Sequence, residues 1–276
     1  MPSCITVNLH TKEIVMREFG INLRATTAIS DEAYIKTVAE LGFTTIFDMA
    51  RPKEEITRLF ALCDACGLRY ETLHAPFDGI NAIWKDNDDG DRMLKQLLDG
   101  VDKCCMVNAP ILVVHLSSGI FPPSTTDIGR GRFAKLVEYA MQKDIKIAFE
   151  NQRKLFNLAW AMETFGPETG VGFCWDCGHE GCFTPGKQFM PLFGDRLICT
   201  HIHDNPGFFN DDRHMLPFDG NLDFNRIAGQ LREYRWQGSL MLEVSAKNHA
   251  EYAEKYSPEE FLRRAAASVK RLSQMI

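Results

Sequence analysis

Eight short apolar and β-branched runs alternate with amphipathic helical segments, and this alternation constrains the fold more than any other feature. The runs lie at residues 20–24, 44–48, 69–74, 111–115, 146–150, 170–176, 196–201 and 239–243. Strands that alternate with helices are typical of a parallel sheet. With no Gly/Ser-rich linker between them, the eight units predict one α/β domain over residues 1–276, a single (β/α)8 TIM barrel. A doubly wound open sheet is the alternative, but the first strand is followed by neither G-x-G-x-x-G nor a P-loop.

Local signals mark where several helices begin and end. Ser30 and Ser257 precede helical stretches and are expected to cap them, the second with a proline in the first turn. Glycines follow three predicted helix ends and are expected to act as C-terminal caps: Gly42, Gly67 and Gly166.

The charge balance disfavours nucleic acid as a partner. The chain has 31 Lys and Arg against 37 Asp and Glu, a net charge of −6. Acidic runs at 86–91 and 210–212 are expected to lie in loops around the mouth of the barrel and to repel DNA. No window approaches the roughly 18 apolar residues of a membrane span, and the N-terminal residues lack a signal-peptide pattern. We therefore expect a cytoplasmic protein that acts on a small molecule, with no membrane partner.

Nearly every predicted strand after the second ends in a side chain that can bind a metal ion. These residues are His74, His115, Glu150, Asp176, His201 and Glu243. In a (β/α)8 barrel the C-terminal strand ends converge on one mouth, so residues far apart in sequence would face one cavity. A single buried imidazole or carboxylate is usually a satisfied core group, but six at the same structural position indicate a site. Mixed ligands of this kind suit Zn²⁺, Mn²⁺, Co²⁺ or Fe²⁺, and the oxygen-rich subset suits Mn²⁺ or Mg²⁺.

Further candidates lie close to these strand ends. His179 follows Asp176 by three residues, and Asp212 and His214 follow the seventh strand. Arg153, three residues after Glu150, is a candidate for binding a substrate hydroxyl or phosphate, and Trp175 for stacking on a sugar.

The stretches LHAPF, VVHLSS, IAFEN, WDCGH, HIHDN, DDRH-MLP and LEVS, in this order, resemble the xylose-isomerase-like TIM-barrel superfamily. This superfamily contains sugar isomerases, sugar epimerases and the abasic-site endonuclease, and the resemblance runs from about Gly20 to the C-terminus. In its epimerase-like members one divalent ion is held by Glu, Asp, His and Glu. Position by position, the resemblance assigns these roles to Glu150, Asp176, His201 and Glu243, and it implies that His179 contacts substrate.

The endonuclease branch binds three zinc ions with nine ligands, and all nine have matching types here. They are His74, His115, Glu150, Asp176, His179, His201, Asp212, His214 and Glu243. The ligand set alone therefore leaves one metal or several open. The loop after His214 departs from the family pattern, because the stretch 218–221 keeps only one of two glycines.

The resemblance favours an isomerase or epimerase of a sugar, a sugar phosphate or an inosose-type polyol. A metal-polarised carbonyl makes the adjacent C–H acidic, and Glu150 and Glu243 are the expected acid and base. His74, His115 and His179 would then contact substrate. A multi-metal phosphoester hydrolase and a non-catalytic sugar-binding barrel are the alternatives. Apolar residues in the loops, among them Phe121, Phe208 and Phe209, are compatible with a homodimer contact.

Overall fold

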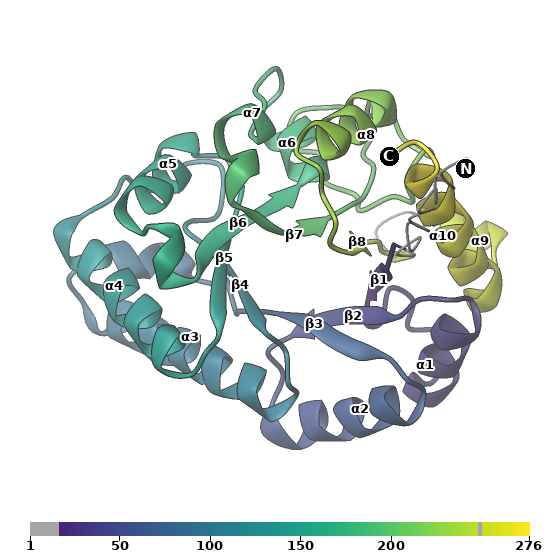
Figure 1. Cartoon of the computed structure of the whole chain (residues 1–276), viewed down its shortest axis with the longest axis horizontal. Coiled ribbons are helices and arrows are strands. Elements are labelled where there is room, and N and C mark those ends of the chain that lie inside the picture. The colour runs from purple at the N-terminus through teal and green to yellow at the C-terminus, as the bar shows by residue number, and fades with distance from the viewer. Residues whose placement is uncertain (1–16, 248–249) are drawn as a thin grey trace, which may run out of the picture.

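The computed structural model describes residues 17–247 and 250–276, and these form a ring of eight parallel strands surrounded by helices (Figure 1). The strands are β1 (Phe19–Asn22), β2 (Thr45–Met49), β3 (Arg69–His74), β4 (Ile111–His115), β5 (Lys146–Glu150), β6 (Val171–Asp176), β7 (Leu197–His201) and β8 (Leu240–Leu242). They pair in the order β7-β6-β5-β4-β3-β2-β1-β8. A parallel bridge between Ile202 and Leu242 joins the two ends of this order. The structure thus confirms the predicted (β/α)8 barrel.

The connections between strands are mainly helical, and the long helices lie outside the ring (Figure 1). The α-helices are α1 (Asp31–Glu40), α2 (Lys53–Ala65), α3 (Asp88–Met106), α4 (Asp127–Gln142), α5 (Leu155–Thr164), α6 (Cys177–Phe183), α7 (Met190–Phe193), α8 (Phe224–Glu233), α9 (Ala250–Lys255) and α10 (Pro258–Ser273). Short 3-10 turns span Ile80–Trp84, Pro167–Thr169 and Gly194–Arg196. None of the helices in the described part is long and apolar enough to cross a membrane.

The predicted caps are found at most of the expected places. The Ser30 hydroxyl accepts from the amide of Ala33, and Ser257 caps α10 in the same way. Gly42 has a φ of 91°, in the left-handed region that a helix C-cap requires. Gly166 differs, because its φ is −66° and it precedes a 3-10 turn instead of ending α5. The left-handed residue of that connection is Gly170.

The acidic run at 86–91 is not the free loop that the sequence suggested. Asn87 caps α3, and Asp88, Asp89 and Asp91 lie in the first turn of that helix, where the helix dipole favours negative charge. Asp91 also pairs with the buried guanidinium of Arg132. These acids therefore have a local structural role, and their presence alone does not indicate a surface that repels DNA.

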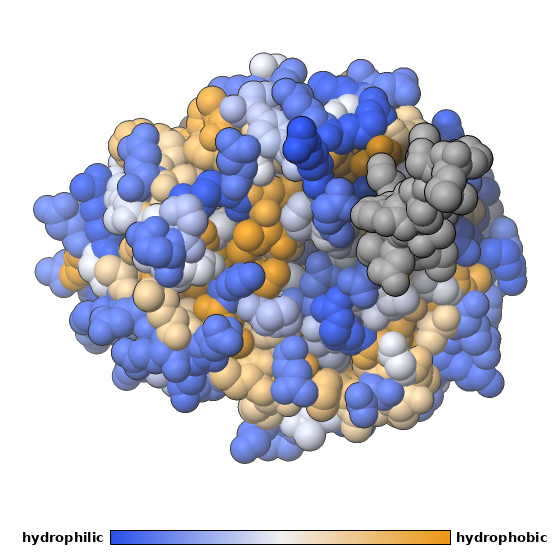
Figure 2. Space-filling model, viewed as in Figure 1, coloured by the Kyte–Doolittle hydropathy of each residue, from blue (hydrophilic) through white to orange (hydrophobic). Residues whose placement is uncertain are grey.

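Two apolar clusters show which strand residues face inward. The larger cluster contains residues of both strands and helices and fills the layer between them. A smaller one contains Ile111, Val113, Ala148, Cys174 and Cys199, and we place it inside the barrel. Because side chains alternate along a strand, the residues two positions after these also face the inside of the barrel, nearer its mouth. On the surface, Figure 2 shows hydrophobic residues near the middle of one face, within a largely hydrophilic margin.

Candidate metal centre

The strand period places four candidate ligands above the small inner cluster. Val113, Ala148, Cys174 and Cys199 each precede a ligand by two residues: His115, Glu150, Asp176 and His201, respectively. Because side chains two apart share a face of a strand, each ligand lies on the same side as its apolar neighbour but nearer the strand's C-terminal end. The barrel interior thus supports the ligands on short buried side chains.

Glu150 is the hub of the cluster, and it is 1% exposed. Its Oε2 lies 2.6 Å from His115 Nε2 and 3.2 Å from His74 Nε2, and these two nitrogens are 3.2 Å apart. Its Oε1 lies 3.0 Å from His201 Nδ1. His201 Nδ1 is also 3.0 Å from Glu243 Oε2, so one nitrogen faces two carboxylates. Ligand atoms of Glu150, Asp176, His201 and Glu243 all lie within 4.8 Å of one another.

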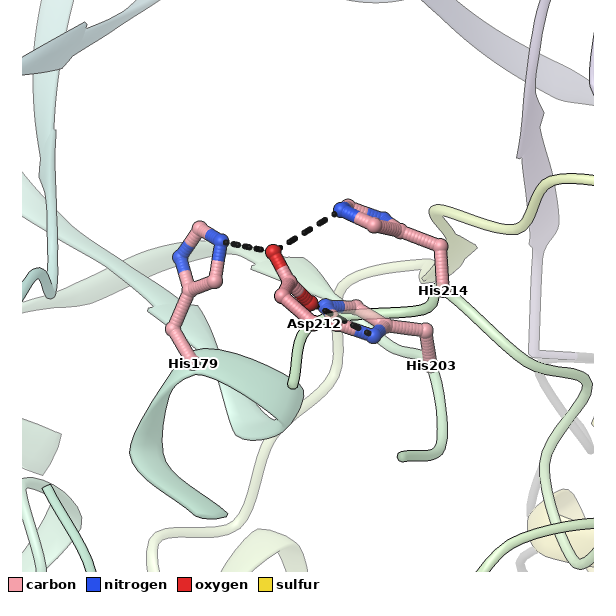
Figure 3. A group of neighbouring side chains, drawn as sticks. All are labelled: His179, His203, Asp212 and His214. Carbon is pink, nitrogen blue, oxygen red and sulfur yellow. Dashed lines mark ion pairs between the residues drawn. The ribbon is translucent and has the colours of Figure 1, made fainter. Parts of the chain in front are cut away.

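A second group of potential ligands, drawn in Figure 3, lies next to Glu150, whose Oε1 is 3.4 Å from His179 Nδ1. Asp212 Oδ2 lies 3.3 Å from His179 Nε2 and 3.2 Å from His214 Nε2, and it stands between the two rings. His203 stacks on His214 with ring centroids 4.1 Å apart. His179 comes from α6, whereas the other three residues come from the connection after β7. These four residues form the second group of ligand atoms within 4.8 Å of one another.

The start of α6 connects the two groups. Asp176 is the N-cap residue of this helix, and its Oδ1 accepts from the amide of His179 at 2.6 Å. The three-residue spacing between Asp176 and His179 therefore follows from helix capping. The same hydrogen bond orients the Asp176 carboxylate. His203 Nε2 lies 3.0 Å from the same Asp176 oxygen. Gly178 makes room for that imidazole, since a Cβ there would lie 2.0 Å from His203 Cε1.

The donor set fits a divalent cation. Within the described residues, every ion pair of Glu150, Asp176, Asp212 and Glu243 is with an imidazole, and none is with lysine or arginine. The Nδ1 of His74 lies 2.8 Å from the carbonyl oxygen of Ala75, to which it can donate, and this leaves Nε2 free to face the cluster. His214 Nδ1 lies 2.9 Å from the carbonyl oxygen of Glu243 in the same way. Carboxylate oxygens and imidazole nitrogens therefore converge at one place. Both kinds of atom donate electron pairs to divalent metal ions.

The electrostatics of the metal-free cluster are those of carboxylates enclosed by imidazoles. Burial alone would raise the pKa of Glu150, but His115, His201 and His179 outweigh burial and hold it well below its ordinary value. Burial lowers the pKa of His115 to about 4, so this ring is neutral at pH 7. Burial also opposes protonation of His179, but Asp176, Glu150 and Asp212 raise its pKa to about 10.

A cavity of about 240 Å³ opens onto the cluster, and its lining includes six of the predicted ligands. These are His74, His115, His179, Asp212, His214 and Glu243. Glu150 lies beneath them and does not line the cavity, whereas Glu243 reaches it directly. Phe77 stacks on His115 and Phe183 on His179, at centroid distances of 4.7 and 4.5 Å. The cavity therefore has a floor of metal-type ligands between apolar walls.

The structure places the other sequence candidates at two different locations. Arg153 lines the cavity. Trp175 does not, because it is fully buried on the outward side of β6 and its indole N–H donates to Glu180. The alternation that turns Asp176 inward turns Trp175 toward the helices.

Three contributors were missed in the sequence. Gln152 Nε2 lies 3.1 Å from both His115 Nε2 and His179 Nδ1, and its side chain lines the cavity. Phe47 on β2 stacks on His201 with centroids 4.6 Å apart. His203 is the third, and its position two residues after His201 was the available signal.

A family model identifies the family of this chain. A family model described as xylose isomerase-like TIM barrel matches residues 35–272. An uncharacterized protein of Sinorhizobium fredii is 29% identical over 196 residues, which cover 65% of this chain and 60% of that protein. An uncharacterized protein of Methanocaldococcus jannaschii is 24% identical over 199 residues, which cover 63% of this chain and 65% of that protein. The chain thus spans less than two thirds of the length of these curated relatives.

Solved structures with the same architecture include sugar epimerases. The D-psicose 3-epimerase of Clostridium cellulolyticum H10, with D-tagatose, superposes with a TM-score of 0.72 at 15% identity and covers 94% of this chain and 99% of its own. An L-ribulose 3-epimerase gives 0.69 at 18% identity, with 94% and 96% covered. The 3-keto-D-glucoside 4-epimerase of E. coli gives 0.68 at 17% identity, with 94% and 100% covered. At these identities the likeness is one of fold.

Proposed function

The chain belongs to the xylose isomerase-like TIM-barrel family, and from this premise we propose that it is a divalent-metal-dependent isomerase or epimerase of a sugar or sugar-like polyol. The observation that carries the proposal is the convergence of Glu150, Asp176, His201 and Glu243 beneath a small cavity. The fold neighbours add support, since several of them bear the names of sugar epimerases.

Glu150, Asp176, His201 and Glu243 would hold the ion. A divalent ion at this position supplies a Lewis acid that polarises a substrate carbonyl and acidifies the neighbouring C–H. His179 and Gln152 line the cavity and present polar atoms to a substrate. Phe77 and Phe183 exclude water from its sides. The mixed imidazole and carboxylate ligands suit Zn²⁺, Mn²⁺, Co²⁺ or Fe²⁺.

We assign proton transfer to the two glutamates. Glu243 lines the cavity with 19% of its side chain exposed, so it can reach a substrate carbon directly. Glu150 lies beneath the cavity with its Oε1 3.0 Å from the same His201 nitrogen, and the family resemblance assigns it the second proton transfer. One carboxylate removes a proton beside the carbonyl, and the other returns a proton to a different position or face.

Solvent exchange tests this assignment directly. We expect the metal-loaded protein, incubated in D₂O with a panel of ketoses, ketose phosphates and inososes, to place deuterium on a carbon beside the carbonyl of its substrate. NMR detects the label even where the net conversion is small. Absence of exchange across the panel would overturn the proposal.

A multi-metal phosphoester hydrolase is the second candidate. The specific observation in its favour is that all nine endonuclease-type ligands lie in adjoining groups. Clustered divalent ions serve phosphodiester hydrolysis by activating water and stabilising the leaving oxygen. The net charge of −6 argues against a duplex substrate. We expect no cleavage of an abasic duplex by the metal-loaded protein, and salt-sensitive binding followed by cleavage would favour this second function.

A further inference from the structure

Arg153 is a half-buried cation at the wall of the cavity without an acidic partner. Its Nε lies 3.0 Å from Asn210 Oδ1, and its Nη2 donates to the same neutral oxygen. Its Cζ lies 3.5 Å from the centre of the Phe183 ring. Among the described residues no carboxylate forms an ion pair with Arg153, and Nη1 makes no hydrogen bond. The Nη1 group of this partly desolvated guanidinium is therefore free to donate to a ligand.

Some partly buried arginines of the barrel are neutralised by carboxylates, whereas Arg17 and Arg196 donate to backbone carbonyls. Arg132 pairs with Asp91 at 2.7 Å, and Arg226 pairs with Glu180 at 2.6 Å. Removing a guanidinium from water without a counter-charge or hydrogen-bond acceptors costs free energy. Arg153 has the amide oxygen of Asn210 as its acceptor, and unlike these other arginines it lines the cavity, where a ligand can supply the missing charge.

Further donors line the same cavity. The backbone of Ser118 is fixed by Asn81, which donates to its carbonyl at 2.8 Å and accepts from its amide at 2.9 Å. Neither the Ser118 hydroxyl nor the Gly119 amide has a hydrogen bond within the described residues. Gly119 has a φ of 77°, and nothing lies within 4 Å of the Cβ position, so its backbone is open to a ligand.

We propose that the substrate carries an anionic group, a phosphate or a carboxylate, and that Arg153 binds this group together with Ser118 and Gly119. The guanidinium presents a planar set of donors that matches the oxygens of either anion. A neutral hydroxyl would leave the charge of Arg153 unpaired. The inference rests on the proposed function for one point, namely that the carbonyl end of the substrate lies over the metal ligands.

Matched ligands that differ only in charge test the inference. Isothermal titration of the metal-loaded protein would compare D-fructose with D-fructose 6-phosphate, and D-glucitol with D-glucitol 6-phosphate, which has no carbonyl. A keto-uronate replaces the phosphate by a carboxylate and so identifies the preferred anion. We expect at least one anionic ligand to bind about tenfold or more tightly than its neutral counterpart, as a charged hydrogen bond requires.

Three variants locate the source of that preference. Arg153→Met keeps an apolar contact with Phe183 and removes the charge, so the preference should disappear. Arg153→Lys keeps the positive charge but lacks the planar guanidinium, so it should retain part of the preference for anionic ligands. Lys154→Met is the matched control, because the adjacent Lys154 binds Ser124 at 2.7 Å and does not line the cavity. Lys154→Met should bind like the parent protein, and thermal unfolding of each variant verifies its fold.

The outcomes separate this inference from the proposed function. Equal binding of neutral and anionic ligands by the parent protein, or an undiminished preference in Arg153→Met, would overturn the anion site. Proton exchange with neutral ketoses would survive that result. Conversely, Arg153-dependent binding of glucitol 6-phosphate without proton exchange in any ketose would keep the anion site and remove the isomerase proposal.

Discussion

His203 connects the two groups of ligands through its two ring nitrogens. Its Nε2 lies 3.0 and 3.1 Å from the two oxygens of Asp176, and its Nδ1 lies 3.9 Å from Asp212 Oδ1. The side chain is fully buried. Because it approaches the Asp176 carboxylate from outside the set of four proposed ligands, we regard it as a positioning residue for that carboxylate.

We expect His203→Ala to weaken metal binding by about 10- to 100-fold, the usual effect of losing a hydrogen-bond partner of a ligand. His203→Gln should retain part of the affinity, since its amide N–H can replace the lost donor. Competition with a chromophoric chelator measures both dissociation constants. Unchanged affinity in His203→Ala would leave His203 with a packing role alone.

Glu243→Gln should reduce turnover by about two to four orders of magnitude while the barrel stays folded. The amide keeps the volume of the carboxylate but cannot accept a proton, and the ion pair with His201 is lost. Steady-state rates and circular dichroism provide the two readouts. Glu138→Gln, an exposed acid on α4, is the control and should behave like the parent. Retained turnover in Glu243→Gln would remove this residue from the chemistry.

In the connection after β7, one carboxylate binds several backbone amides. Asp204 accepts hydrogen bonds from four backbone amides, those of Asn205, Phe218, Gly220 and Leu222. These bonds fasten residues 218–222 to the start of the connection, while Asn205 binds the Asp212 carboxylate and accepts from the amide of Arg213. The loop also holds Phe218 at a φ of 75°, a strained position for a residue with a side chain.

We expect Asp204→Ala to lower the free energy of unfolding by about 1–3 kcal/mol, because buried amides would lose their acceptor. Urea unfolding measures this change, and limited proteolysis reports opening of the loop. Asp211→Ala is the matched control, since Asp211 pairs with Arg213 at the surface of the same loop. A surface pair contributes at most about 1 kcal/mol. Equal losses in the two variants would contradict the special role of Asp204.

The element pattern was readable in the sequence because buried parallel strands are apolar runs bounded by polar residues. The eight predicted strands agree with the structure to within two residues at each end. The position of Gly166 was misjudged, because a 3-10 turn separates α5 from β6. Phe218 shows a further limit, since only the tertiary hydrogen bonds of Asp204 explain a left-handed phenylalanine.

For the site, strand-end positions predicted which residues converge, but not what surrounds them. His74, His115, Asp212 and His214 lie where the strand ends and the β7 connection suggested. Gln152 carried no such signal, because its contact with His115 and His179 depends on how the chain turns after β5. Trp175 was predicted to stack on a sugar because of its aromatic ring. The alternation of side chains along β6 instead turns it toward the helices.

At the scale of the whole molecule, metal removal should end turnover without unfolding the barrel, because its apolar layers do not depend on the ion. In the metal-free protein, the pKa of His179 is raised to about 10 and that of His214 to about 9. The protonated forms of these two histidines stabilise the folded protein, fully so below about pH 6.5. This contribution is lost as the pH rises through 9 and 10. The thermal midpoint after chelation should therefore fall between pH 7 and 10, and a rise would contradict the pairing.

Metal binding should release protons and should tighten as the pH rises. Glu243 and Glu150 outweigh the effect of burial and raise the pKa of His201 well above its ordinary value, so the metal-free ring carries an extra proton at pH 7. An ion requires a neutral imidazole, and it must displace that proton from the nitrogen facing both carboxylates. Titration calorimetry in two buffers of different ionisation enthalpy gives the number released. About one proton per ion is expected if the His201 site alone fills, and further release with a second ion would show that His179 and His214 also bind metal. Binding without any proton release would exclude His201 as a ligand.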